Sequence, residues 1–276
     1  MRILVPCDFS NLSSLAFQTA VKFAGCTGGK VTLLHVIAAS GDVLVDISGN
    51  LIETSEMDLS MVRSDMDIAR ARIDSMIKGS GYANVDFKVL PGQIEEVVTH
   101  ETTISNYDLV IMGTHGAYGL KELFIGSHTE HVAMKSHAPV LAIKSADHSF
   151  NHIVFAASFA EPVIIPDVVL QFQKCFKATL HLLNVETKDS SINKQEVSRK
   201  MNEVASKYHI PADNVNIVPG FDVETGIENF CTEQNVGLVV METKGRTGIN
   251  RWINGCISAG LVNHTPYALL TFKKSK

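Results

Sequence analysis

The segment LVIMGTHG (109–116) is a short apolar run that ends in glycines, and it returns downstream as LVVMETKG (238–245). Three other segments return in the same order: RILVPCDFS (2–10) as HIVFAASFA (152–160), VTLLHV (31–36) as LHLLNV (180–185), and VLPG (89–92) as IVPG (217–220). Matches that keep their order along a chain indicate an internal duplication. The sequence therefore predicts one structural unit that occurs twice.

The distance between matched segments locates an insertion in the first copy. The first two pairs lie 150 and 149 residues apart, whereas the last two lie 128 and 129 residues apart. Because this distance falls once, the first copy carries a longer segment, which we place at about 38–60. The polar stretch SADHSFN (145–151) separates the copies. We predict one domain over residues 1–146 and a second over residues 147–276.

Each copy alternates apolar strands with amphipathic helices. Runs rich in Val, Ile and Leu at 2–7 and 31–37 are typical of strands that are buried on both faces. Between them, apolar residues recur at helical spacing from Leu12 to Phe23, with Ser10 in the N-cap position. The same reading predicts helices at 59–76, 93–103 and 120–135, and strands at 85–89, 108–112 and 140–144. Alternating strands and helices indicate an α/β fold with a five-stranded parallel sheet in each copy.

Composition excludes several classes of protein. The chain has 276 residues, of which 45% are hydrophobic, so a disordered protein is excluded. A net charge of −5 disfavours a general nucleic-acid binder. No window approaches the ~20 apolar residues of a membrane helix, and the N-terminus lacks the pattern of a signal peptide. The five cysteines show no CxxC spacing. We therefore expect neither a disulfide scaffold nor a zinc site, and a reduced, soluble, cytoplasmic protein.

The glycines that follow residues 109–112 suggest an anion site. In an open parallel sheet, ligands bind at the carboxyl ends of strands, where the strand order reverses. Glycine there can adopt positive φ, and it lets backbone N–H groups approach a phosphate. A helix N-terminus adds positive partial charge, and Ser127 and Thr129 can add hydroxyl donors. The GK[ST] ending of a Walker loop is absent. The residues alone leave two alternatives, a phosphate site or tight packing of strand, loop and helix.

Four residues of this segment carry a resemblance to a known family. Gly113, Gly116, Gly126 and Ser127 match G-x2-G-x9-G-[ST], the nucleotide-loop pattern of the universal stress proteins. VPCDFS (5–10) resembles that family's first strand with its Asp, and His35-Val36 resembles the end of its second strand. The resemblance covers both copies, so the chain resembles a tandem universal stress protein. It implies two Rossmann-like, adenine nucleotide α-hydrolase-like domains, each with strand order 3-2-1-4-5.

The same resemblance implies an adenine-nucleotide site in the first copy, for ATP or another adenylate. The backbone around Val36 would meet the adenine edge, and Asp8 would contact the ribose or a nucleotide-bound Mg²⁺. The implied contact residues are Pro6, Asp8, Val36, Met112, Gly113, His115, Gly116, Gly126, Ser127, His128 and Thr129. The alternative for Asp8 is a cap on the following helix.

The second copy departs from the pattern at three important positions. Glu242 takes the place of Gly113, Ser158 that of Asp8 and Cys256 that of Ser127. A carboxylate about 5 Å from a phosphate charge costs about 3 kcal/mol at an effective dielectric constant near 20, or roughly a hundredfold in affinity. Lys244 and Arg246 can offset part of this cost, which leaves a different anion open. We predict a structural or regulatory partner without ATP, and we expect Gly113→Glu to abolish nucleotide binding with the fold intact.

Other reactive side chains favour simpler interpretations. His115, His128 and His131 raise a metal hypothesis, but the HxxH pair lacks the acidic residue that follows the first His in a hydrolytic zinc site. We interpret them as surface or phosphate-contacting residues. Cys7 fits a buried strand position. Ser127 and His128 are consecutive helical residues that point apart, so they form no catalytic dyad, and we predict no catalytic residue.

We predict a nucleotide-binding regulatory protein of a stress response, in which ATP shifts the surface of the first copy toward or away from a protein partner. One alternative is a weak ATPase or nucleotidyl-transfer enzyme, which would lack an evident general base. Another is a scaffold with vestigial sites. The resemblance also implies an internal pseudo-dimer that pairs the last strands, 140–144 and 268–273, and leaves a further homodimer open.

Overall fold

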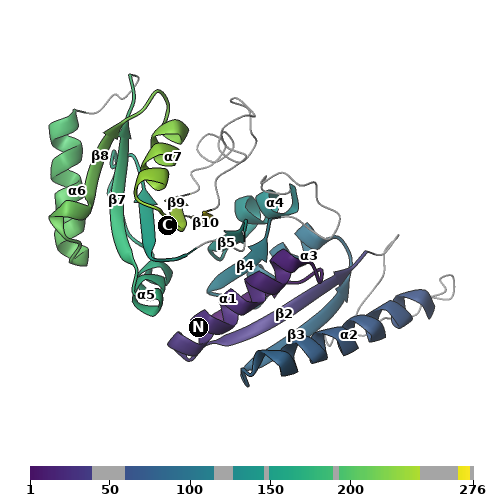
Figure 1. The fold of residues 1–276 in the computed structure, drawn as a ribbon. Coiled ribbons are helices and arrows are strands. Elements are labelled where there is room, and N and C mark those ends of the chain that lie inside the picture. Colours follow the sequence, from purple (N-terminus) through teal and green to yellow (C-terminus); the bar gives the residue numbers. More distant parts are fainter. Residues whose placement is uncertain (39–59, 115–126, 146–148, 189–192, 243–266, 274–276) are drawn as a thin grey trace. The chain divides into compact units, whose positions relative to one another are not determined.

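The structure, a computed structural model, describes residues 1–38, 60–114, 127–145, 149–188, 193–242 and 267–273. These residues form two compact units, the first ending at Ile143 and the second beginning at Lys144 (Figure 1). The insertion expected near 38–60 lies almost wholly outside the described residues, and so does the predicted boundary at residue 146.

The first unit is a five-stranded parallel sheet with the order β3-β2-β1-β4-β5. Its strands are β1 (Arg2–Pro6), β2 (Lys30–Ile37), β3 (Val85–Pro91), β4 (Leu109–Gly113) and β5 (Val140–Ile143). Its helices are α1 (Asn11–Thr27), α2 (Ser60–Ser80), α3 (Ile94–Ile104) and α4 (Ser127–Lys135). The α/β class and the 3-2-1-4-5 order are confirmed.

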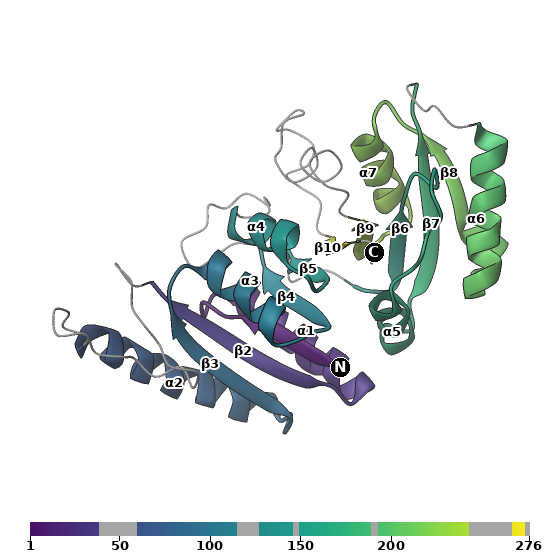
Figure 2. The same ribbon diagram turned by 180° about the vertical axis from the view of Figure 1, so that it is seen from behind.

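Strand periodicity divides the core of this unit into two layers. Alternate strand residues such as Leu4, Val110 and Met112 pack with Val98 of α3 and Val132 of α4. The α1 and α2 helices cover the opposite face of the sheet (Figures 1 and 2). Because both faces are covered, β4 and β5 are apolar throughout, as the sequence indicated.

The second unit repeats the strand order as β8-β7-β6-β9-β10. Its strands are β6 (His152–Ala156), β7 (Thr179–Glu186), β8 (Val215–Pro219), β9 (Leu238–Glu242) and β10 (Ala268–Phe272). Its helices are α5 (Asp167–Phe176), α6 (Lys194–Tyr208) and α7 (Val223–Glu233), with a 3-10 turn η1 at Ala212–Asn214. The α6 and α7 helices lie on opposite sides of this sheet (Figure 1). The duplication inferred from the sequence is thus a duplication of the fold.

Two expectations about single residues have different outcomes. Ser10 is the N-cap of α1, with its Oγ accepting a hydrogen bond from Ser13 N at 3.1 Å, as predicted. Cys7 and Cys231 are buried free thiols, but Cys26 and Cys175 are disulfide-bonded, so the expectation of a reduced chain is wrong for these two.

No helix within the described ranges is long and apolar enough to cross a membrane.

Candidate functional site

The carboxyl edge of the first sheet contains a point where the strand order reverses. From β1 the chain moves outward through β2 and β3, and it then returns to β4 on the other side of β1. The segments that follow β1 and β4 therefore meet at this edge, with Asp8 on one side and Gly113 on the other. Such a crevice is the usual ligand position in an open α/β sheet.

Gly113 allows a close approach between the end of β4 and the first turn of α1. A Cβ added to Gly113 would lie 2.8 Å from Leu12 Cβ and 3.0 Å from the Leu12 carbonyl carbon. Gly113 is not among the described glycines with positive φ, so the expected conformational role is replaced by a steric one. The end of β4 and the first turn of α1 are therefore tightly packed at Gly113, and this packing has an electrostatic consequence. It brings the N-terminus of α1, whose first turn contains no acidic residue, to the crevice.

Thr129 fixes α4 against the same strand end. Its side chain is 2% exposed, and its hydroxyl donates to the Gly113 carbonyl oxygen at 3.0 Å. The hydroxyl proton is therefore directed at the protein, in contrast to the predicted donation to a phosphate. Thr129 positions the first turn of α4 relative to Gly113.

His128 interacts with a side chain that the sequence did not single out. Its Nδ1 lies 2.5 Å from Oε1 of Glu95, in the first turn of α3. Burial alone would raise the pKa of the Glu95 carboxyl, but hydrogen bonds from its own backbone N–H and from His128, with the charges of His128 and His131, lower it. Glu95 is thus an anion at neutral pH, and its pairing with His128 links α3 to α4.

A strained turn connects β1 to α1. Asp8 is exposed, and its Oδ1 accepts a hydrogen bond from Ser10 N at 3.0 Å. Phe9 has a φ of 64°, which is rare for a bulky residue. His35, at the end of β2, lies with its Nδ1 2.7 Å from the Cys7 carbonyl oxygen, and because a carbonyl only accepts, Nδ1 carries the proton. The turn is thereby fixed to the neighbouring strand.

The second unit builds the same turn without the carboxylate. Phe159 has a φ of 52°, and Ser158 Oγ accepts a hydrogen bond from Ala160 N at 3.3 Å. Asn184 Nδ2, at the position of His35, donates to the Ala157 carbonyl oxygen at 3.1 Å. A serine is therefore sufficient for this backbone turn, so the negative charge of Asp8 is not a requirement of the fold.

The second unit, in which Glu242 replaces Gly113, also starts its first helix later. The α1 helix begins at Asn11, soon after β1 ends at Pro6. The α5 helix begins only at Asp167, although β6 ends at Ala156. Because of this longer connection, the residues of the second unit that correspond to the first turn of α1 are not helical. The second unit therefore has no helix N-terminus at the place where α1 meets Gly113 in the first unit.

The remaining predicted residues are only partly described. Pro6 and Met112 are buried, with Met112 in the core under α3 and α4, and Val36 is half-buried beside the same core. Ser127 begins α4, but its side chain is outside the description. The other predicted residues outside it are His115, Gly116, Gly126, Lys244, Arg246 and Cys256. Within the part that the structure describes, no three His, Cys, Asp or Glu side chains are arranged to hold a metal ion.

Comparisons with known proteins agree with this fold. The model of the universal stress protein family matches residues 1–144. The universal stress protein MJ0577 of Methanocaldococcus jannaschii is 30% identical over an alignment of 154 residues, which covers 52% of this chain and 94% of that protein. The stress response protein NhaX of Bacillus subtilis is 28% identical over an alignment of 165 residues, which covers 52% of this chain and 97% of that protein. A crystal structure of a universal stress protein from Archaeoglobus fulgidus covers 100% of this chain and 97% of its own, with a TM-score of 0.69 and 21% identity. That likeness concerns the fold alone.

Proposed function

The chain belongs to the universal stress protein family, and we propose that its first unit binds an adenine nucleotide, ATP above all, as a regulatory module of a stress response. Nucleotide binding would shift the surface that a protein partner recognises, by no more than the difference in nucleotide affinity between the two states. The family pattern that the first unit carries, from Gly113 to Ser127, is a nucleotide-loop pattern.

The observation that supports this proposal most is the contact between Gly113 and the first turn of α1. It places backbone N–H groups and the positive end of a helix at the crevice between β1 and β4. A helix N-terminus contributes about 0.3–1 kcal/mol toward an anion at an exposed site. In this arrangement Thr129 and the His128–Glu95 pair hold the first turn of α4 beside the end of β4, and backbone N–H groups after β4 would meet the phosphates.

Asp8 fits a role at a nucleotide-bound Mg²⁺. Mg²⁺ is usually held by one or two carboxylates together with substrate phosphates and water. Asp8 is an exposed carboxylate at the crevice, and within the described ranges no ready-made group of metal ligands accompanies it. The nucleotide phosphates and water would therefore supply most of the Mg²⁺ ligands. The cation would neutralise phosphate charge next to Asp8.

For the second unit we propose a structural or regulatory role without ATP. Its turn contains Ser158 in place of Asp8, and Glu242 adds a negative charge where Gly113 stands in the first unit. The late start of α5 also removes a helix N-terminus from that place.

Isothermal titration calorimetry of the full chain with ATP, AMP, adenosine and GTP tests this function. We expect one adenine-selective site per chain. In Asp8→Asn the amide oxygen can still accept from Ser10 N, so the turn is preserved and only the charge is lost. This variant should bind Mg-ATP less tightly than wild type but should bind ATP without Mg²⁺ at least as tightly, because a like charge is removed. Asp65→Asn, on α2, is the matched control. Absence of adenine-nucleotide binding by the wild-type chain would refute the proposal.

A further inference from the structure

The α2 and α6 helices correspond residue for residue at a distance of 128 positions. They end at Ser80 and Tyr208, and buried Ala69 and Ile73 of α2 correspond to buried Val197 and Met201 of α6. In this register two further positions correspond. Arg72 matches Lys200, and Ile68 matches Glu196.

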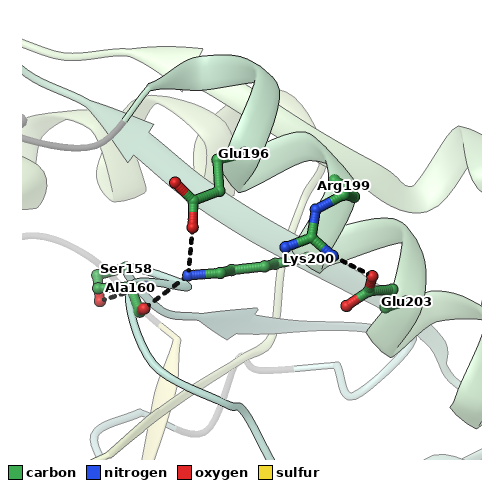
Figure 3. Close-up of polar contacts among 6 residues, drawn as sticks. All are labelled: Ser158, Ala160, Glu196, Arg199, Lys200 and Glu203. Carbon is green, nitrogen blue, oxygen red and sulfur yellow. Dashed lines mark hydrogen bonds and ion pairs between the residues drawn. The ribbon is translucent and has the colours of Figure 1, made fainter.

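In the second unit this basic residue is bound by groups of the protein itself. Figure 3 shows Lys200 Nζ between two acceptors, the Ala160 carbonyl oxygen at 2.8 Å and Oε1 of Glu196 at 3.0 Å. The hydrogen bond from Lys200, and its charge, lower the pKa of the Glu196 carboxyl. Lys200 therefore joins α6 to the turn after β6 with its charge neutralised.

In the first unit the corresponding arginine reaches the equivalent turn, but α2 lacks the carboxylate that pairs with Lys200 in the second unit. The Arg72 guanidinium carbon lies 4.3 Å from the centroid of the Phe9 ring, and that ring lies 4.6 Å from the His35 ring. Ile68 stands where the second unit has Glu196, and it is 64% exposed. Over the described ranges, Arg72 takes part in no ion pair. The first unit, whose sequence carries the pattern from Gly113 to Ser127, thus leaves the positive charge of Arg72 outside any ion pair of the described residues.

Arg72 lies close to the candidate site. The turn that it covers contains Asp8 and leads directly into the N-cap Ser10 and the first turn of α1. Burial raises the pKa of the Cys7 thiol, and the charges of Asp8 and Arg72 act on the same thiol in opposite directions. Both charges therefore act at the carboxyl end of β1.

We propose that Arg72 is a phosphate-binding residue of the first unit, in which the guanidinium, held against the Phe9 ring, pairs with a phosphate group of the bound nucleotide. This inference rests on the proposed function. A planar guanidinium donates two parallel hydrogen bonds to phosphate, and stacking on an aromatic ring orients it. In the second unit, where the glycine has become Glu242, a lysine neutralised within the protein takes its place.

The test compares Arg72→Gln with Arg70→Gln, which removes an arginine of the same helix that pairs with Asp67 at 3.2 Å. Calorimetry is done with ATP and with adenosine, which has the same base and sugar but no phosphate. For Arg72→Gln we expect ATP affinity to fall about tenfold or more, and adenosine affinity to stay within twofold of wild type. Arg72→Lys should restore part of the ATP affinity, because it restores the charge without the planar group. Arg70→Gln should bind both ligands as wild type does.

Three results would overturn the inference. If Arg72→Gln binds ATP as tightly as wild type, Arg72 contacts no phosphate, although the proposed function stands. If Arg72→Gln loses ATP and adenosine affinity equally, Arg72 supports the site structurally. If the wild-type chain binds neither ligand, the proposed function itself fails. Thermal melts of each variant verify folding, and the surface position of Arg72 predicts melting temperatures close to wild type.

Discussion

A Gly113→Ala substitution tests whether the close contact between β4 and α1 is a requirement of the first unit. The new Cβ would lie 2.8 Å from Leu12 Cβ and 3.0 Å from the Leu12 carbonyl carbon. Comfortable carbon contacts need about 3.5–4.0 Å, so the first turn of α1 must recede by roughly 0.5–1 Å. No rotamer change can relieve the clash, because it involves backbone atoms. The added Cβ would also lie 3.2 Å from Ser13 N, which the Ser10 side chain caps.

Overpacking of this kind costs about 1–3 kcal/mol of the free energy of unfolding. For a unit of this size we expect the melting temperature to fall by about 3–9 °C, measured by thermal circular dichroism. Gly25→Ala is the matched control, because Gly25 lies in α1 itself and a Cβ there meets nothing within 4 Å. That change should stabilise the helix by about 0.5–1 kcal/mol.

A Gly113→Ala protein that melts at the wild-type temperature would refute the packing argument. Gly113→Glu introduces the same Cβ, so we expect it to lower stability as well as nucleotide binding, while the fold survives as the sequence predicts. Loss of nucleotide binding in Gly113→Glu would therefore have two causes, and the alanine variant is needed to separate packing from charge.

Two further predictions concern stability. Thr129→Val removes the donor to the Gly113 carbonyl oxygen and should cost about 1–3 kcal/mol in urea unfolding. Thr99→Val changes a buried hydroxyl that has no hydrogen-bond partner among the described residues, so it should be neutral or stabilising. Equal effects of the two substitutions would contradict the role assigned to Thr129. Burial, and then the charge of neighbouring His152, lower the pKa of His181 in the folded protein, so the unfolded chain binds the proton first and stability should fall as pH drops below about 6.5. His181→Gln should flatten this part of the stability–pH curve, and an unchanged curve would exclude His181 as its source.

Much of the fold could be predicted because it depends on patterns that local sequence carries. The repeated apolar runs gave the strands, and the order of the repeats gave the duplication, since each strand of a doubly covered sheet is apolar on both faces. The Ser10 cap was predictable from residue type and from its place before Asn11. The strand order, by contrast, came from the family resemblance.

The candidate site was harder to predict, because its contacts join residues far apart in the sequence. The steric role of Gly113 depends on where α1 begins, and the hydroxyl direction of Thr129 depends on the end of β4. No local pattern links His128 to Glu95. For Arg72 a signal did exist. A basic residue recurs at the same position of both copies, as Lys200, but this is evident only after α2 and α6 are aligned.

Backbone NMR of the full chain during an ATP titration tests the central claim most directly, because each amide reports on its own unit. The account predicts large chemical-shift changes at Thr114 and in the first turn of α1, with little change at Ser158 and Ala160 in the second unit. Shift changes concentrated at Ser158 and Ala160, or none in either unit at saturating ATP, would contradict it.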